Sequence, residues 1–240
     1  SPVRAVLIGA GHRGNIYAAY ALKYPQELKI VAVADPSLER RTRMAKQHGI
    51  PEDRCFTDWK QVFSLPKFAD AIIISTPDHL HTEPCLTALD AGYDVLLEKP
   101  VAPTEAECRL ILEKAQQTQR IVGVCHVLRY SPYFRELKEV IDAGLIGDII
   151  SVHHMEPIEH IHMSHSYVRG KWRNSKKATP IILAKSCHDT DIIRWLVGNP
   201  VHDVHCFGNL RWFTNKNAPP GSTERCTDGC KVEGSCAYSA

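Results

Sequence analysis

Over its first half the chain alternates short, continuous apolar runs with longer amphipathic segments, and few folds accommodate this pattern. The apolar runs are rich in Val and Ile without polar alternation, as is typical of parallel strands buried on both faces. We expect strands at residues 3–8, 29–34, 71–74, 94–97 and 121–124. We expect helices at residues 12–24, 37–48, 80–91 and 103–117. The alternation predicts an α/β fold with right-handed crossovers and a doubly wound parallel sheet.

The pattern changes near residue 126. Beyond it we expect two helices, at residues 132–143 and 180–197, because a proline opens each and a glycine follows each. Two further segments resemble strands, at residues 147–152 and 204–213. Residues 153–175 are expected to form a long, His-rich loop.

These changes predict two domains, at residues 1–125 and 126–240. The second is expected to be an α+β domain with an open, mainly antiparallel sheet. Two strands cannot make a sheet that covers a helix, so this domain is expected to be truncated in this chain.

Composition excludes several classes of protein. Lys+Arg 29 against Asp+Glu 27 gives a net charge of +2 with no basic stripe, which argues against a nucleic-acid partner. No apolar run approaches the ~18 residues that cross a bilayer, so no membrane partner is expected. The first six of nine cysteines are dispersed among apolar segments. Such cysteines are typical of a reducing compartment, and we expect a cytoplasmic protein.

A glycine-rich turn follows the first predicted strand and opens the first predicted helix. Gly9, Gly11 and Gly14 fit the pattern G-x-G-x-x-G, with His12 and Arg13 between the last two glycines. Gly9 suits a tight turn, Gly11 the approach of a pyrophosphate to the backbone, and Gly14 close helix–strand packing. The helix N-terminus adds N–H donors and a positive dipole end. These five residues are therefore candidate dinucleotide contacts.

Asp35 ends the second predicted strand, 21 residues after Gly14. A carboxylate at this position binds the ribose hydroxyls of NAD and repels the 2′-phosphate of NADP. NAD is therefore the expected cofactor. NADP stays the alternative, because Arg40 and Arg41 lie close in sequence. A tight turn with a helix-capping Asp is the structural explanation that competes with dinucleotide binding.

Three further segments complete an ordered set of motifs: residues 75–81 (STPDHLH), 98–100 (EKP) and 185–196 (KSCHDTDIIRWL). With the glycine turn, they resemble the glucose–fructose oxidoreductase/inositol dehydrogenase (Gfo/Idh/MocA) family from residue 3 to about residue 213. The resemblance implies a Rossmann domain and an α/β domain whose open sheet covers the nicotinamide. It implies hydride transfer between NAD(P) and a carbinol carbon of a sugar, cyclitol or related polyol. Homodimers or homotetramers are also expected from it.

Carried over by position, the resemblance implies site residues in both domains. The expected cofactor contacts beyond the glycine turn and Asp35 are Thr76, Pro77, His79, His81, Glu98, Lys99 and His126. Among the expected substrate contacts, the resemblance implies Arg129. Lys185, Arg169 and Trp172 are added from their own chemistry, as a candidate ligand of a substrate oxygen and as sugar contacts in the His-rich segment. Lys99 and His188 are the expected catalytic residues.

The residues themselves support both catalytic assignments. Lys99 lies at the C-terminal end of a predicted parallel strand, outside which α/β proteins bind ligands. His188 and Lys185 are spaced i, i+3 on a predicted helix and can point the same way. Histidine can take a hydroxyl proton while hydride leaves for the nicotinamide. A surface lysine before Pro100 and a buried, hydrogen-bonded histidine are the competing structural explanations.

One position departs from the family pattern. Many members carry an acid four residues before the helix histidine, where this chain has Ala184. Two replacements stay open: Lys185 as a ligand of a substrate oxygen, or Asp189 as the group that orients the imidazole. The departure also argues against copying inositol as the substrate.

Two clusters suggest metal binding without a matching pattern. Five histidines crowd residues 153–165 beside Glu156 and Glu159, but no H-E-x-x-H or comparable pair lies on a predicted helix or strand. We therefore expect no metal there, and consider a polar wall for a hydroxylated substrate or a solvated loop. Cys226, Cys230 and Cys236 do not have zinc-ribbon spacing, and structural metal, a disulfide and free thiols all stay open.

The leading hypothesis is an NAD(P)-dependent polyol dehydrogenase. One alternative is an NAD-dependent glycoside hydrolase that oxidises the sugar transiently and eliminates the aglycone. The other is a non-catalytic dinucleotide-binding sensor, which would bind NAD without turnover.

Overall fold

The computed structural model describes residues 1–176 and 178–239 of the chain. These divide into two compact units, Ser1–Val127 and Leu128–Ala240. The division falls two residues after the boundary expected from the sequence. Among the described residues, no helix has the length and apolar character that crossing a membrane requires.

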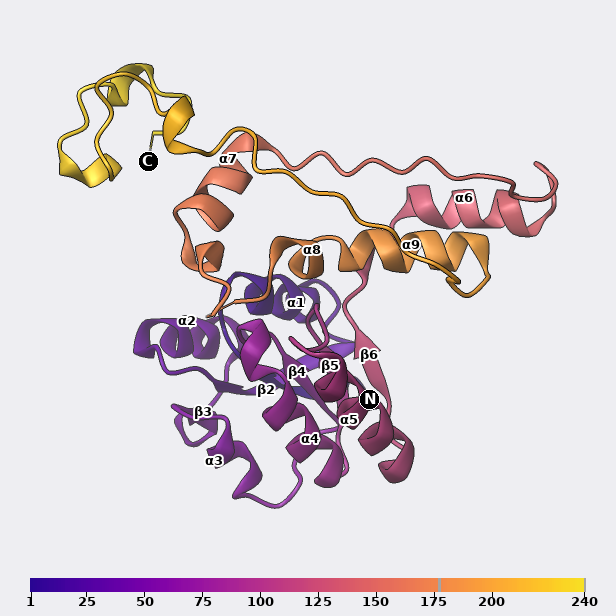
Figure 1. Cartoon of the computed structure of the whole chain (residues 1–240). Helices are drawn as coiled ribbons and strands as arrows, with labels where there is room; N and C mark the ends of the chain where they lie inside the picture. Colours follow the sequence, from indigo (N-terminus) through magenta and orange to yellow (C-terminus); the bar gives the residue numbers. More distant parts are fainter. Residues whose placement is uncertain (177, 240) are drawn as a thin grey trace. The chain divides into compact units, whose positions relative to one another are not determined.

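The first unit is built on a six-stranded parallel sheet with the order β3-β2-β1-β4-β5-β6 (Figure 1). The strands are β1 Val3–Ile8, β2 Leu28–Ala34, β3 Cys55–Phe56, β4 Ala71–Ile74, β5 Asp94–Leu97 and β6 Val122–Val124. Strand β1 pairs with both β2 and β4, so the chain winds outward from the centre in two directions. The predicted doubly wound sheet is confirmed.

Helices connect these strands. They are α1 His12–Lys23, α2 Leu38–His48, α3 Lys60–Phe63, α4 Thr82–Asp90 and α5 Glu105–Thr118, with short 3₁₀ turns η1 Glu52–Arg54 and η2 Asp78–Leu80. Capping side chains define two of the starts. Ser37 accepts from the N–H of Arg40, and Thr104 accepts from the N–H of Glu107. Thr104 also donates to the Glu107 carboxylate, which completes a capping box.

The sheet carries a core on each face. Val6 and Ile8 of β1 pack in a cluster with residues of α4 and α5. Ala5 and Leu7 pack on the opposite face in a cluster with residues of α1 and α2. Alternate residues of a strand point to opposite faces, so the continuous apolar runs of the sequence serve both cores at once.

Two elements of the first unit were not predicted from the sequence. Strand β3 has only two residues, and α3 has only four. Elements this short have no measurable period, so no apolar pattern marks them. The helix predicted over 80–91 is divided into η2 and α4.

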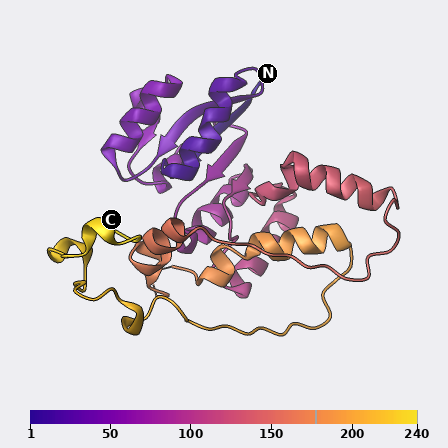
Figure 2. The ribbon, with the colours of Figure 1, turned by 90° about the horizontal axis from the view of Figure 1, so that it is seen from above.

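The second unit is helical where it is regular. Its elements are η3 Val127–Tyr130, α6 Pro132–Asp142, α7 His160–Met163, the π-helical turn η4 Ser164–Val168, η5 Lys171–Arg173, α8 Ile181–Ala184, α9 Cys187–Val197, η6 Asn215–Asn217, η7 Cys226–Asp228 and η8 Glu233–Ser235. Ser131 caps α6 by accepting from the N–H of Phe134. Long irregular stretches join α6 to α7 and follow α9 (Figures 1 and 2).

Three expectations for the second unit need correction. The segments 147–152 and 204–213 are not strands, because neither pairs with a strand in the described part of the chain. Their apolar side chains stay in solvent, with Ile150 at 92% and Phe207 at 94% exposure. The expected loop over 153–175 contains α7, η4 and η5. A strand needs a partner strand for its hydrogen bonds, and sequence pattern alone does not supply one.

Candidate functional site

The glycine turn between β1 and α1 has a geometry that only glycine permits at two positions. Gly9 has φ +90°, and a Cβ there would lie 2.7 Å from the Ser75 carbonyl oxygen. A Cβ at Gly14 would lie 2.1 Å from the Gly9 carbonyl oxygen. Gly9 therefore makes the tight turn and Gly14 lets α1 approach the turn, as the sequence predicts.

Gly11 has a different role, because its neighbourhood is open. It caps α1, and the nearest atom to an added Cβ would be Arg40 Nη1 at 4.0 Å. Asn15 Nδ2 fixes the turn by donating to the Gly11 carbonyl (2.7 Å) and the Ala10 carbonyl (3.1 Å). His12, the first residue of α1, is exposed. An open backbone at the positive end of a helix suits a diphosphate.

Asp35 follows β2 and is 4% exposed. Its Oδ2 accepts from the N–H of Ala10 at 2.8 Å and its Oδ1 from the N–H of Ser37 at 2.8 Å. Arg40 Nη1 lies 3.7 Å from Oδ2. Each carboxylate oxygen can accept more than one hydrogen bond, so the ribose role predicted for Asp35 is compatible with this arrangement. The same carboxylate also holds the glycine turn in place.

The loop after β4 carries four of the expected cofactor contacts. Thr76 Oγ1 donates to the Leu80 carbonyl at 3.2 Å, and Pro77 caps η2. His79 is half exposed, with Nδ1 3.6 Å from the Asp78 carboxylate. His81 is 1% exposed, and its two ring nitrogens lie 2.9 Å from the Pro100 carbonyl oxygen and 3.0 Å from the Thr76 carbonyl oxygen. We therefore assign His81 a positioning role, since both ring nitrogens bind backbone carbonyls that join two loops.

Glu98, at the end of β5, is the centre of a buried network. Its Oε1 accepts from Arg13 Nε at 2.5 Å and from the Tyr17 hydroxyl at 2.6 Å. Its Oε2 accepts from the N–H of Lys99 at 2.6 Å, and Arg13 Nη2 donates to the Tyr17 oxygen at 2.6 Å. Glu98 thus connects α1 to the lysine loop. Arg13, expected at the cofactor, is bound to this carboxylate instead.

Burial sets the protonation of the groups beside Glu98. Burial, and then hydrogen bonds to Cys125 and Glu98, raise the pKa of Tyr17 far above its ordinary value. Burial raises the pKa of Cys125 to about 11. Both groups are therefore neutral near pH 7, and Tyr17 acts as a donor to Glu98. Tyr17 was not predicted as a site residue. Its i, i+4 spacing from Arg13 is the sequence feature that could have indicated it.

Lys99 and His126 follow neighbouring strands. Lys99 comes directly after Glu98 and is half-buried, and its peptide bond to Pro100 is cis. His126 follows β6, and its N–H donates to the Val124 carbonyl at 2.7 Å. The carboxyl ends of β1, β2, β4, β5 and β6 lie at one edge of a parallel sheet. That edge is where α/β folds bind ligands, and it gathers the candidate cofactor residues of this unit.

In the second unit, Arg129 forms an ion pair with the side chain of Asp191. Its Nε and Nη2 donate to the two carboxylate oxygens of Asp191 at 2.7 Å and 2.6 Å. Its guanidinium also lies over the Trp195 ring, 5.7 Å from the centroid. The hydrogen bond to Asp191 raises the pKa of Arg129 against the opposing effect of burial. The structure therefore shows Arg129 in an ion pair with Asp191.

The helix expected over 180–197 is broken before His188. Helix α8 ends at Ala184 with Lys185 as its C-cap, and α9 begins at Cys187, so Lys185 and His188 are not spaced on one helix as expected. Lys185 Nζ lies 2.9 Å from His162 Nε2. His188 is in the first turn of α9, where its N–H donates to the Lys185 carbonyl at 3.0 Å. Ala184, at the position where the family resemblance implies an acid, is buried.

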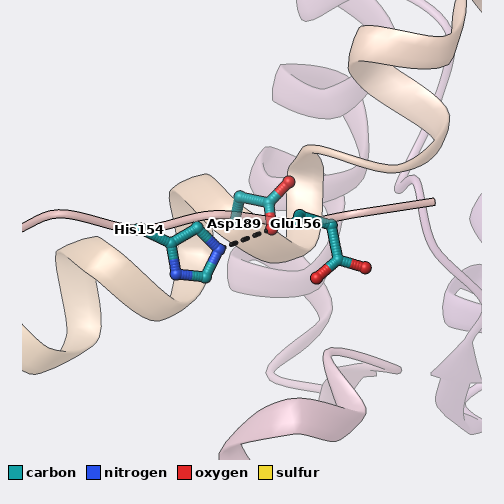
Figure 3. Close-up of side chains that lie close together, drawn as sticks. All are labelled: His154, Glu156 and Asp189. Atoms are coloured by element: carbon teal, nitrogen blue, oxygen red, sulfur yellow. Dashed lines mark hydrogen bonds and ion pairs between the residues drawn. The ribbon is translucent and has the colours of Figure 1, made fainter.

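Asp189, which one alternative assigns to orienting the His188 imidazole, contacts a different histidine in the structure. Its Oδ1 lies 2.8 Å from Nε2 of His154, which comes from the His-rich segment. Glu156 lies beside this pair on the same segment as His154 (Figure 3). One ligand-type atom from each of the three residues lies within 4.8 Å of the others. No sequence pattern marks this group, because Asp189 lies far along the chain from the other two residues.

Arg169 and Trp172, expected as sugar contacts, have other neighbours. Arg169 Nη1 donates to Cys226 Sγ at 2.9 Å, and its Nη2 donates to the Tyr238 carbonyl. The Trp172 ring lies under the Lys171 ammonium at 4.6 Å. The structure thus connects Arg169 to the cysteine-rich segment. In the described part of the chain, none of the cysteines forms a disulfide.

Two family models match the chain. Residues 3–126 match the model described as "Oxidoreductase family, NAD-binding Rossmann fold". Residues 134–226 match the model described as "GFO/IDH/MocA C-terminal domain". The two matches correspond to the two units of the structure.

Individual proteins that are similar to this chain are named as inositol dehydrogenases. The chain is 30% identical to inositol 2-dehydrogenase 4 of Saccharopolyspora erythraea over 224 residues, covering 92% of this chain and 61% of that protein. It is 29% identical to the NAD(+)-dependent scyllo-inositol 2-dehydrogenase of Bacillus subtilis, covering 87% of this chain and 58% of that protein. The chain thus spans about six tenths of the length of these relatives.

Solved structures share the fold. Myo-inositol 2-dehydrogenase from Lactobacillus plantarum superposes with a TM-score of 0.71 at 26% identity, covering 82% of this chain and 57% of that one. Scyllo-inositol dehydrogenase from Lactobacillus casei, solved with NAD(H) and scyllo-inositol, has a TM-score of 0.71 at 25% identity with the same coverage.

Proposed function

Because the chain belongs to the GFO/IDH/MocA family of oxidoreductases, we propose that it acts in NAD-dependent hydride transfer from a carbinol carbon of a polyol. Relatives named as inositol and scyllo-inositol dehydrogenases make cyclitols the first substrate class to test. Sugars are the second class, because Ala184 departs from the acid that many family members carry.

The glycine turn carries this proposal. Gly9 and Gly14 fix a turn whose open backbone at Gly11 faces no close neighbour. Asp35 holds the same turn through the N–H of Ala10. The residues of the first unit therefore fit a dinucleotide: α1 for the diphosphate, Asp35 for the ribose, and the lysine loop after β5 for the nicotinamide end. The acidic Asp35 favours NAD over NADP.

NAD, when bound, accepts the hydride that leaves the carbinol carbon. The hydroxyl proton must leave in the same oxidation, and the product is a ketone. We assign Lys99 to this hydroxyl, because it follows the strand end of β5 and its backbone is fixed by Glu98. We assign His188 and Lys185 of the second unit to substrate hydroxyls. Arg129 keeps a supporting role through Asp191.

The test is a panel of cyclitols and sugars with the chain and NAD, with NADH followed by absorbance and products by chromatography. We expect NADH to accumulate with one polyol class. Lys99→Met and His188→Gln should each lower kcat/KM by roughly 10²-fold or more. Lys46→Met, an exposed residue on α2, is the matched lysine control and should leave the rate unchanged.

NAD affinity is measured in parallel by calorimetry, which separates binding from turnover. NAD binding without turnover on any substrate, unchanged by Lys99→Met, would support the sensor hypothesis. Release of an aglycone that requires NAD but yields no net NADH would support the glycoside hydrolase. Absence of NAD binding would overturn the proposal altogether.

A further inference from the structure

We propose that His154, Glu156 and Asp189 form a binding site for a divalent transition-metal ion in the second unit. One imidazole nitrogen and two carboxylate oxygens from these residues lie within 4.8 Å of one another. His154 Nε2 and Asp189 Oδ1 are already 2.8 Å apart. The proposal concerns binding alone and is independent of the proposed function.

Local structure explains why these side chains meet. His154 and Glu156 are two residues apart on one extended segment, a spacing that places side chains on the same side (Figure 3). Asp189 comes from the first turn of α9. Two elements distant in sequence thus supply the set.

Burial and charge fit a cation. Asp189 is buried, His154 is half-buried and Glu156 is exposed, so the group is held on one side and open on the other. Two carboxylates within this short distance repel each other unless a cation lies between them. Three protein ligands leave coordination positions for water or a ligand, as in metal sites that exchange ligands.

The types of ligand atom limit which metal ions fit the proposed site. Imidazole together with carboxylates suits Zn²⁺, Co²⁺ or Mn²⁺, whereas Ca²⁺ takes six to eight oxygen ligands. Ligand atoms about 2.1 Å from one ion stand roughly 3 to 3.5 Å apart. The His154–Asp189 pair must therefore open by a few tenths of an ångström from its 2.8 Å hydrogen bond.

This proposal replaces the expectation of no metal that the sequence supported. That expectation rested on the absence of a metal-binding pattern within the His-rich segment. Asp189 lies outside the segment and is brought to it by the fold. The competing explanation is a plain His–Asp hydrogen bond, with Glu156 near it only by chance.

The probe is Co²⁺ added to the metal-free, reduced chain, with binding followed by calorimetry and visible absorption. Co²⁺ reports its ligands, because thiolate ligation adds an intense charge-transfer band that nitrogen and oxygen ligands lack. This separates the proposed site from Cys226, Cys230 and Cys236. Competition with Zn²⁺ then compares the affinities of the two ions, and we expect the site to bind Zn²⁺ more tightly than Co²⁺.

We expect binding at one site without the thiolate band. Glu156→Gln, Asp189→Asn and His154→Gln should each weaken it by about 10-fold or more. His153→Gln, an exposed neighbour on the same segment, is the matched control and should change nothing. Circular dichroism checks that each variant folds. If Asp189→Asn fails to fold, the exposed Glu156→Gln still decides the question.

Three results would overturn the proposal. One is no Co²⁺ or Zn²⁺ binding up to millimolar concentration. Another is binding with the thiolate band that the three variants leave unchanged. The last is equal weakening by His153→Gln and His154→Gln, since that would indicate general histidine binding on the segment.

Discussion

At the scale of single residues, Glu98 shows how a predicted site residue can serve the site indirectly. The family resemblance implies that Glu98 lies beside the nicotinamide. In the structure its two oxygens accept from Arg13, Tyr17 and the N–H of Lys99. The residue is 5% exposed, and these donors satisfy the carboxylate oxygens that burial removes from water. Glu98 is therefore a positioning residue for Lys99 and for α1.

We expect Glu98→Gln to lower the free energy of unfolding by about 2 kcal/mol, because charge-assisted hydrogen bonds become weaker neutral ones and Arg13 loses its counter-charge. NAD affinity should fall as well, since α1 carries the glycine turn. Urea denaturation and calorimetry measure the two effects. Glu39→Gln, an exposed glutamate on α2, is the control. Equal stability of the two variants would contradict the role given to Glu98.

The cysteines give a second prediction at this scale, one that depends on pH. Burial raises the pKa of Cys85 to about 12 and of Cys125 to about 11. Backbone hydrogen bonds from Thr223 and Val232 lower the pKa of Cys230. Only the thiolate reacts with iodoacetamide, and its fraction falls tenfold for each pH unit below the pKa. Near pH 8, Cys85 and Cys125 are thus about one part in a thousand thiolate or less.

We therefore expect Cys230 to be alkylated first and Cys85 and Cys125 last, with the difference shrinking as the pH rises. Peptide mapping by mass spectrometry after timed labelling gives the order. Exposed Cys206 serves as the reference for free access. Labelling of Cys125 as fast as Cys206 in the folded chain would show that its thiol is not buried as described.

At the scale of elements, the turn between β1 and α1 depends on backbone space. Gly9→Ala must fit a Cβ at φ +90° and 2.7 Å from the Ser75 carbonyl oxygen. Gly92 has a similar φ of +78° but nothing within 4 Å of its added Cβ. The second substitution therefore meets backbone strain alone, of about 1 kcal/mol, and is the matched control.

We expect Gly9→Ala to cost roughly 3 kcal/mol or more in unfolding free energy, because backbone clash adds to the strain, and to abolish NAD binding. Gly92→Ala should bind NAD like the parent chain. Denaturant titration and calorimetry compare the two. If both variants behave alike, the contact with Ser75 does not determine the turn.

The boundaries of the strands and helices could be predicted from the sequence only in part. Buried parallel strands were predicted to within one residue, because each carries its own apolar run. The helix over 180–197 was predicted as one element, but it breaks between Ala184 and Cys187. No Gly or Pro marks that break, so tertiary packing decides it. As a consequence, Lys185 and His188 do not share one helix, although the sequence pattern predicts that they do.

At the scale of the whole molecule, the two units differ in how much their sequence determines. In the first, the glycine turn, Asp35 and the Glu98–Pro100 motif all lie at the strand ends that the pattern predicted. In the second, the segments 147–152 and 204–213 have the residues of strands without described partners. Pairing is a non-local property, so composition alone cannot supply it. The ion pairs of Arg129 and His154 were missed for the same reason.

This difference leads to a prediction about the first unit alone. Every buried residue of its two cores lies between Ala5 and Ile111, on both faces of one sheet. A domain with its own core can fold by itself. We therefore expect residues 1–127 to unfold cooperatively and to bind NAD within roughly tenfold of the full chain, a difference of about 1.4 kcal/mol. Chemical denaturation and calorimetry test both properties.

The Gly9→Ala change within residues 1–127 is the control, since it should remove NAD binding from the isolated unit as it does from the full chain. A folded unit with much weaker NAD binding would mean that the second unit contributes directly to the affinity for the cofactor. A fragment that does not fold would mean that the two cores are insufficient for stability. Because the candidate contacts of the diphosphate and ribose lie before residue 127, we expect neither result.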